Sequence, residues 1–266
     1  MEKKECLIKR LETIAQSIQK TNVGLALLAL GSGGLERDRL DNFSDLDFFV
    51  IVEDGYKQHF IRNLDWLARI HKISFSYQNT VDGHKVLFED GIFCEFAIFE
   101  KDELKHIPFS EGRIIWKKDG FDETICLPLN MKENKQDKDW YIGEILTTLY
   151  IGLGRYHRGE KLSAFFLIQH RCIEKLIMLF HQTHPISNKL AVDPFNISRR
   201  FEKNHPDIGN ISKLMLGYDK TIQSAHNIIE YLNKNYSINS FMYKNILELI
   251  HFNQEDKEEE YGVNGN

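Results

Sequence analysis

Proline and cysteine are scarce in this sequence, whose 266 residues include 5 prolines and 4 cysteines. Hydrophobic residues at 42% and charged residues at 27% are typical of an ordinary globular protein, and they exclude a disordered or collagen-like chain. No two cysteines have the close spacing of a zinc or redox motif. We therefore expect reduced thiols in a cytoplasmic protein, at Cys6, Cys94, Cys126 and Cys172.

Long apolar runs and an excess of positive charge are also missing. No stretch approaches the ~20 apolar residues of a membrane span, and the N-terminus is charged and amphipathic instead of forming an apolar signal core. Membrane partners are therefore not expected. A net charge of -5 gives no general attraction to polyanions, so a small-molecule partner is favoured over a nucleic acid.

Hydrophobic periodicity divides the chain into a β-rich half and a helical half. In the first half, apolar residues at helical spacing occur at the start and once more between the strands, whereas the pattern of the second half predicts a helical bundle. The sequence therefore predicts an α+β protein with a mixed sheet and flanking helices. The expected parts are a catalytic domain at 1–128, a helical bundle domain at 129–254 and an acidic flexible tail at 255–266.

The expected elements follow from the period of the apolar residues. Asp90-Gly91 is a turn signal that predicts a hairpin between two of the strands. The helices of the β-rich half are expected at 3–20 and 56–70, its strands at 25–30, 46–52, 73–77, 85–88 and 92–99, and two of the later helices at about 209–234 and 238–252.

Glycines end the first apolar strand at Gly31-Ser32-Gly33-Gly34, before a polar stretch that is expected to be helical. Glycine lets the backbone approach a ligand closely, and exposed amides or a hydroxyl at such a turn can bind phosphate oxygens. The same cluster also fits a plain turn at the end of a strand.

Two carboxylates share the second strand in Asp45-Leu46-Asp47. Alternation along a strand sends both to one face, where their repulsion is relieved by a cation. Hard oxygen ligands beside a phosphate site suit Mg²⁺. The alternative is a solvated pair at the start of the strand.

A third carboxylate, Glu95, lies inside the apolar strand 92–99. Burying an ionised carboxylate is unfavourable unless it meets a metal, pairs with a base or accepts a proton. An internal salt bridge or an exposed strand edge would explain it equally well.

The order and spacing of these pieces resemble the DNA polymerase beta-like nucleotidyltransferase superfamily. Its signature is a hydrophobic strand, Gly-Ser or Gly-Gly, a short intervening stretch, Asp-hydrophobic-Asp on the next strand and a carboxylate on a later strand. Here the strand ends at Gly31-Ser32, residues 33–44 intervene, and Asp45-Leu46-Asp47 and Glu95 follow. Chain length and the helical second half are most similar to the nucleotidyltransferases that adenylylate lincosamides or aminoglycosides.

The resemblance implies transfer of a nucleoside monophosphate from a triphosphate, with ATP expected, to an acceptor hydroxyl. Asp45 and Asp47 would hold Mg²⁺, while Gly31 and Ser32 would bind the triphosphate. Glu95 would act as a general base or complete the metal site. A homodimer is a family-level expectation.

The acceptor is expected in a cleft, which is the usual place for a small-molecule site, and the helical half would supply one wall of that cleft. Candidate wall residues in the helical half are Glu144, Arg155, Arg158, Arg171 and Glu174. Two other readings stay open: a transferase that modifies a protein or RNA, as toxin-antitoxin partners do, and a regulatory module that binds nucleotide without turnover.

Overall fold

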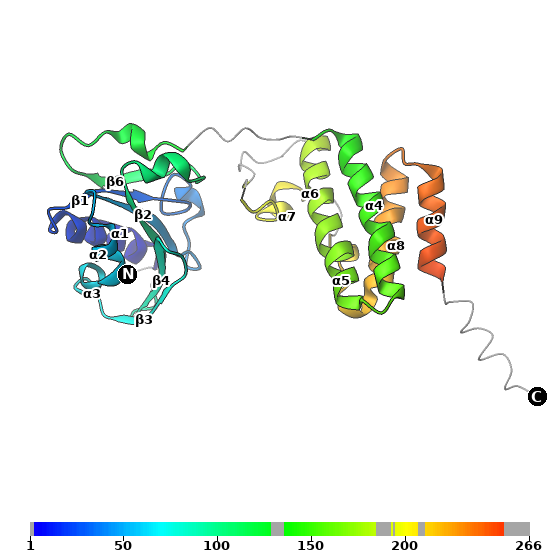
Figure 1. The fold of residues 1–266 in the computed structure, drawn as a ribbon, viewed down its shortest axis with the longest axis horizontal. Helices are drawn as coiled ribbons and strands as arrows, with labels where there is room; N and C mark the ends of the chain where they lie inside the picture. The colour runs from blue at the N-terminus through cyan, green and yellow to red at the C-terminus, as the bar shows by residue number, and fades with distance from the viewer. Residues whose placement is uncertain (1–2, 129–135, 185–192, 194, 207–210, 253–266) are drawn as a thin grey trace, which may run out of the picture. The chain divides into compact units, whose positions relative to one another are not determined.

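A computed structural model describes residues 3–128, 136–184, 193, 195–206 and 211–252 (Figure 1). The chain forms two compact units, Met1–Glu133 and Asn134–Asn266. The first contains a mixed sheet with helices and the second is helical, which confirms the α+β prediction. The predicted tail at 255–266 lies outside the described residues, and the predicted domain limits stay predictions.

The β-rich unit is built on a six-stranded sheet of order β3-β4-β5-β2-β1-β6. β2 and β5 are parallel, and every other neighbouring pair is antiparallel. Gly91 takes a positive φ of 80° in the hairpin between β4 and β5, as its turn signal predicts. The strands are β1 (Gly24–Ala29), β2 (Leu46–Val52), β3 (Ile73–Gln78), β4 (Gly83–Phe88), β5 (Phe93–Glu100) and β6 (Arg113–Lys117).

One face of the sheet is covered by the helices α1 (Lys3–Gln19), α2 (Lys57–Arg62) and α3 (Asp65–Ala68). Leu7, Ile14 and Ile18 of α1 recur at helical spacing and are fully buried. Alternate residues of the strands, such as Phe48 and Phe96, meet them in one core. Burying a large apolar side chain stabilises the fold by about 1.5–3 kcal/mol, so this core fixes which residues face away from it.

The opposite face is covered only in part. Leu28, Ile51, Phe99 and Phe109 form a smaller cluster there, with the turns η2 (Glu103–His106) and η3 (Glu123–Cys126) beside it. At the β3 edge the aromatic side chains are 54% and 57% exposed, at Phe75 and Tyr77. Polar side chains of the central strands can therefore reach solvent on this face.

Local differences from the sequence prediction have simple causes. The prediction missed β6, an edge strand with half-buried side chains, because it lacks the apolar run that marked the central strands. The stretch after Gly34 is not a helix: it holds only the short 3-10 turn η1 (Arg37–Arg39). Glycines and charged residues there supply no apolar stripe to pack a helix.

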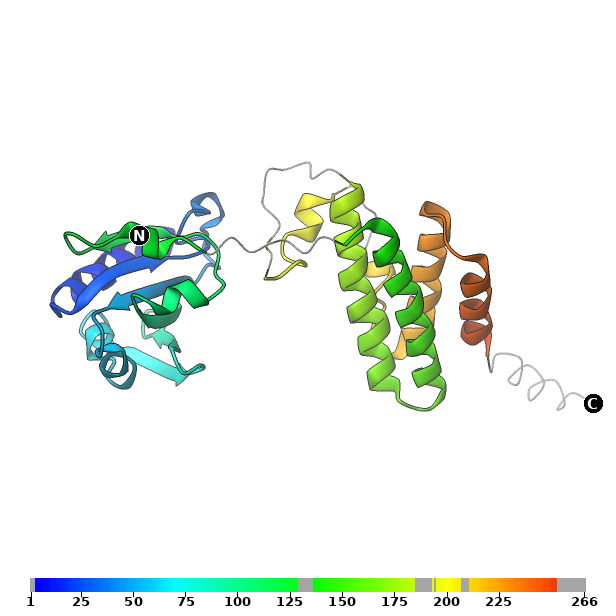
Figure 2. The same cartoon turned by 45° about the horizontal axis from the view of Figure 1, so that its top comes forward.

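The helical unit contains α4 (Lys138–His157), α6 (Cys172–Thr183), α8 (Thr221–Asn235) and α9 (Ser240–His251), which pack around one apolar core. In both views these helices lie side by side (Figures 1 and 2). The expected helix at 209–234 begins only at Thr221, after the 3-10 turn η6 (Tyr218–Lys220). Shorter pieces are α5 (Lys161–Phe165), the π-helical turn η4 (Phe166–Arg171), α7 (Phe201–Asn204) and η5 (Ile211–Lys213).

Across the described ranges, every helix is too short or too polar to cross a membrane.

Gly34 offers a test of the packing behind the glycine turn. A Cβ at this position would lie 2.5 Å from the carbonyl oxygen of Ala29, whereas one at Gly33 would lie 3.3 Å from the end of Leu11 and at ordinary contact distances from Leu30 and Leu46. We predict that Gly34→Ala lowers the free energy of unfolding by about 1–3 kcal/mol, because overpacking shifts the backbone. Gly33→Ala is the control, with a smaller loss. Urea denaturation measures both, and equal losses would contradict the prediction.

Candidate active site

The glycine turn, Asp47 and Glu95 lie at one end of the sheet. The Leu30 amide donates to the carbonyl of Asp47 at 2.8 Å, which joins the glycine turn to β2. Asp47 also stands directly opposite Glu95 in the parallel ladder of β2 and β5. Residues opposite each other in a ladder share a face, so Asp47 and Glu95 project from the sheet together.

Gly31 lies against Asp47 and a cation that the sequence argument did not identify. A Cβ on Gly31 would be 3.7 Å from Oδ2 of Asp47 and 3.9 Å from Nη2 of Arg39. Gly31 also has a φ of +50°, which favours glycine over residues with a side chain. The turn therefore brings backbone, carboxylate and guanidinium together, and Arg39 also pairs with Glu36.

Arg113 of β6 donates two hydrogen bonds to the glycine turn. Its Nη2 donates to the carbonyl of Gly33 at 3.0 Å, and its Nε donates to that of Gly34 at 3.2 Å. Burial lowers the pKa of Arg113 from its ordinary value, and the charge of Arg37 adds to this. Arginine remains protonated despite such shifts, so it supplies the turn with two charge-assisted bonds.

Asp45 differs in detail from the prediction. β2 begins at Leu46, so Asp45 precedes the ladder, while Asp47 lies within it. A local turn leads into Asp45, in which Oδ1 of Asp41 accepts from the amide of Phe43 at 2.8 Å. Asp45 and Asp47 are both half-buried.

Glu95 is less buried than its apolar neighbours suggested, with 42% of its side chain exposed. Oε2 lies 3.1 Å from Nζ of Lys85, and Oε1 accepts from Nδ2 of Asn79 at 2.9 Å. The exposed face of the sheet explains the difference, because alternation turns Glu95 away from the core. A salt bridge, the alternative left open by the sequence, is present.

Strand registers extend this pair into a row across the sheet. Tyr77 of β3 stands opposite Lys85 of β4, Lys85 opposite Glu95, and Glu95 opposite Asp47. We call these residues the carboxylate row. It carries charges of both signs and ends at an exposed aromatic ring. Asn79, Lys85 and Arg39 could not be found from motif spacing, because only strand pairing and loop geometry bring them to the carboxylates.

Cys94, beside Glu95 in sequence, is unsuited to nucleophilic catalysis. Burial raises the pKa of its thiol to about 12; Arg10 opposes the rise, and Asp47 and Asp45 add to it. A thiol with such a pKa stays protonated and unreactive at neutral pH. In the described structure all the cysteines are free thiols.

The chemistry of the row suits a hard divalent cation. Asp47 and Glu95 offer oxygen atoms from adjacent strands, and Asp45 lies one residue before the ladder. Within the described residues, no three His, Cys, Asp or Glu side chains are gathered as a metal-binding group. Glu95 is instead held by Lys85 and Asn79. The donor types fit Mg²⁺, while the three predicted ligands are not assembled around one point.

A separate groove lies in the helical unit, on α4, η4 and α6. Its cavity of about 830 Å³ includes Glu144, Arg155, Arg171 and Glu174 among its lining residues. Four of the five predicted wall residues thus share one surface, whereas Arg158 pairs with Glu160 at the helix junction. The π-helical turn η4 forms part of this wall, and such turns occur frequently at functional sites.

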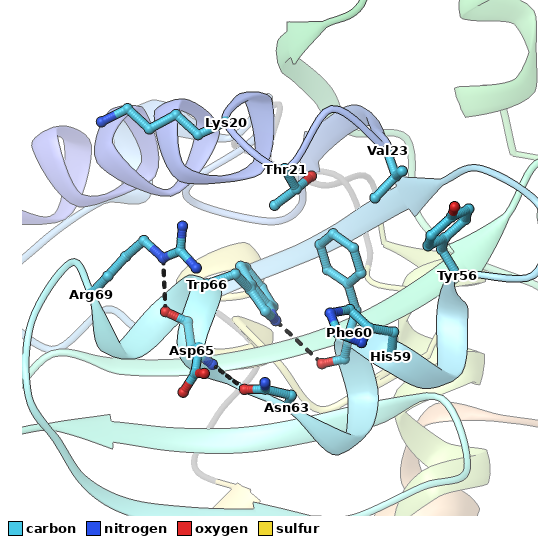
Figure 3. A pocket seen from close by; sticks show the side chains of 10 residues that line it. All are labelled: Lys20, Thr21, Val23, Tyr56, His59, Phe60, Asn63, Asp65, Trp66 and Arg69. Atoms are coloured by element: carbon cyan, nitrogen blue, oxygen red, sulfur yellow. Dashed lines mark hydrogen bonds between the residues drawn. The ribbon is translucent and has the colours of Figure 1, made fainter.

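Another cavity, of about 340 Å³, opens near the start of β1 (Figure 3). Trp66 lies between Phe60 and Arg69 in this view, and its indole donates to the carbonyl of Phe60 at 3.2 Å. Val23 lines the cavity, whereas Gly31 follows the other end of the same strand. The cavity therefore lies at the end of β1 that is far from the glycine turn.

Comparison with protein-family models finds no match, and no curated protein matches either. Solved nucleotidyltransferase structures are similar at low TM-scores. An aminoglycoside 6-adenyltransferase from Bacillus subtilis is 14% identical, with 96% of this chain and 99% of that one covered and a TM-score of 0.33. The STING-associated CdnE c-di-GMP synthase from Capnocytophaga granulosa is 12% identical, with 93% and 78% covered and a TM-score of 0.31.

The CCA-adding enzyme of Thermotoga maritima, in complex with tRNA, is also 12% identical, with 94% of this chain and 64% of that one covered and a TM-score of 0.29. Likeness at this level is too distant to carry an argument. Function therefore rests on the residues of the site.

Arg113 gives a direct test of how the glycine turn is held. We predict that Arg113→Met speeds hydrogen exchange at the amides of Gly34 and Glu36 about fivefold or more, because each lost bond is worth about 1 kcal/mol. Both amides are bonded within the turn. Lys117→Met is the control, since Lys117 lies on the same strand and pairs with Glu123 at 2.8 Å. Unchanged exchange in the Arg113 variant would show that the turn holds without it.

Proposed function

We propose that this protein is a Mg²⁺-dependent nucleotidyltransferase that moves a nucleoside monophosphate from a triphosphate to a hydroxyl of a small molecule. The observation that carries the proposal is the register of β2 and β5, which sets Asp47 opposite Glu95 beside the glycine turn. Carboxylates next to a close backbone turn are what a triphosphate with its divalent ion requires.

In this proposal Asp45 and Asp47 hold the metal, and Glu95 serves as a further ligand or as the base for the acceptor hydroxyl. Mg²⁺, when bound, offsets the negative charge that builds at the α-phosphate. Gly31 and Ser32 place backbone and hydroxyl against the triphosphate. Arg39, which lies beside Gly31, supplies a cation for its phosphates. ATP is the proposed donor.

The proposed acceptor is an antibiotic of the lincosamide or aminoglycoside type, and the groove of the helical unit is its proposed recognition surface. Glu144 and Glu174 present carboxylates there and Arg155, Arg171 and Lys175 present cations. Such a mixture suits a polar molecule with amino and hydroxyl groups. A transferase acting on protein or RNA is the alternative, and the net charge of -5 disfavours RNA.

A pyrophosphate-release screen tests the activity. The protein is incubated with Mg²⁺, each nucleoside triphosphate and panels of lincosamides, aminoglycosides, RNA and proteins. We predict acceptor-dependent release that falls about 100-fold or more in Asp45→Asn with Asp47→Asn, because charge stabilisation in the transition state is lost. Asp54→Asn, at an exposed turn after the other end of β2, should keep full activity. Release unaffected by the double substitution would refute the metal assignment.

The groove has its own test once an acceptor is known. We predict that Glu144→Gln with Glu174→Gln raises KM for a cationic acceptor about tenfold and changes kcat little, since lost uniform binding appears in KM. Glu248→Gln is the control, because that residue forms a surface pair with Lys244. Equal KM values in both variants would assign acceptor binding elsewhere.

A further inference from the structure

Lys85 occupies a position that the proposed chemistry does not yet use. It stands opposite Glu95 in the antiparallel ladder of β4 and β5, and its Nζ lies 3.1 Å from Oε2 of Glu95. Asn79 donates to Oε1 of the same carboxylate at 2.9 Å. Each oxygen of Glu95 therefore already has a partner within the protein.

The register places a competing ligand site on the other side of Glu95. Asp47 is its neighbour on β2, so Glu95 lies between the Lys85 ammonium on one strand and the Asp47 carboxylate on the next. A divalent ion at Asp47 would attract Glu95 by the same electrostatic force that Lys85 now exerts. Lys85 and Asp47, on either side of Glu95, both belong to the carboxylate row.

The Lys85 pair is weak enough to be exchanged. The two side chains are 39% and 42% exposed, and ion pairs of this kind contribute little because water competes for both charges. Holding Glu95 at Lys85 also agrees with the finding that the described residues contain no assembled group of three metal ligands.

Asn79 supplies a second, independent observation. Its Nδ2 donates to Oε1 of Glu95, and this bond fixes the orientation of the amide because a carboxylate needs a donor. Glu95 is therefore held on its Lys85 side by two donors, one from β4 and one from the turn after β3.

We propose that Lys85 is a positioning residue that competes with the divalent ion for Glu95. Lys85 neutralises Glu95 in the described structure. Asp47 and Glu95 would hold a divalent ion together, and Lys85 would then lose Glu95 as its partner. The proposal rests on the proposed function for the identity of the metal site, and it assigns Glu95 to the metal.

The test is a Mn²⁺ titration followed by the loss of the free-ion paramagnetic resonance signal, which needs neither nucleotide nor acceptor. Lys85→Met removes the competitor and should tighten Mn²⁺ binding about three- to fivefold, the upper range for an exposed ion pair. Lys72→Met is the matched control, because Lys72 pairs with Glu89 at 2.7 Å on the same unit and should leave binding unchanged. Melting temperatures confirm that each variant is folded.

A cation close to any metal site also repels the metal, so a double-mutant cycle is needed. If Lys85 acts by competing for Glu95, its replacement gains nothing in a Glu95→Gln background. A gain of equal size in both backgrounds would mean simple repulsion and would overturn the proposal. No gain in either, or wild-type Mn²⁺ binding unaffected by Asp45→Asn with Asp47→Asn, would overturn it as well.

The result of the Mn²⁺ double-mutant cycle can be distinguished from the result of the pyrophosphate-release screen. A positive cycle together with no pyrophosphate release across the screen would leave the Lys85 exchange standing and refute nucleotidyl transfer. Pyrophosphate release without energetic coupling between Lys85 and Glu95 would support nucleotidyl transfer and refute the proposed competition for Glu95. In that second case Glu95 would be left as the base for the acceptor hydroxyl.

Discussion

The parallel pairing of β2 with β5 is the constraint on which the candidate site depends. It is the one parallel pair among the described strands, and its register sets Asp47 beside Glu95. A slip of one residue would turn Glu95 toward the helices, where Phe96 and Cys94 now lie. The apolar face under α1 therefore fixes the register that sets Asp47 beside Glu95, because a slip would expose apolar side chains of the core.

Much of this arrangement could be predicted from the sequence. The run that became β1 is apolar throughout and the run that became β2 is apolar except for Asp47, and the hairpin at Asp90-Gly91 has an explicit turn signal. Short-range patterns of this kind depend only on neighbouring residues. They identified Gly31, Asp45, Asp47 and Glu95 as candidates, and the fold brings the glycine turn, Asp47 and Glu95 to one end of the sheet.

The remainder depended on contacts between residues far apart in the chain. Arg113 is separated from Gly33 by 80 positions, and no local pattern links them. The exposure of Glu95 stayed open because an apolar neighbourhood in sequence alternates between two faces in a strand, and only one of those faces is fully covered. Lys85 and Asn79 became visible only through the β4-β5 pairing and the turn after β3.

The Lys85-Glu95 pair also has a consequence for how the β-rich unit folds. Clustered carboxylates commonly make folding dependent on a bound ion, since their repulsion opposes compaction. Here one of them carries its own counter-charge from the adjacent strand. The charge of Glu95 is thus balanced within the sheet itself, and folding of the β-rich unit does not have to wait for a cation to neutralise this carboxylate.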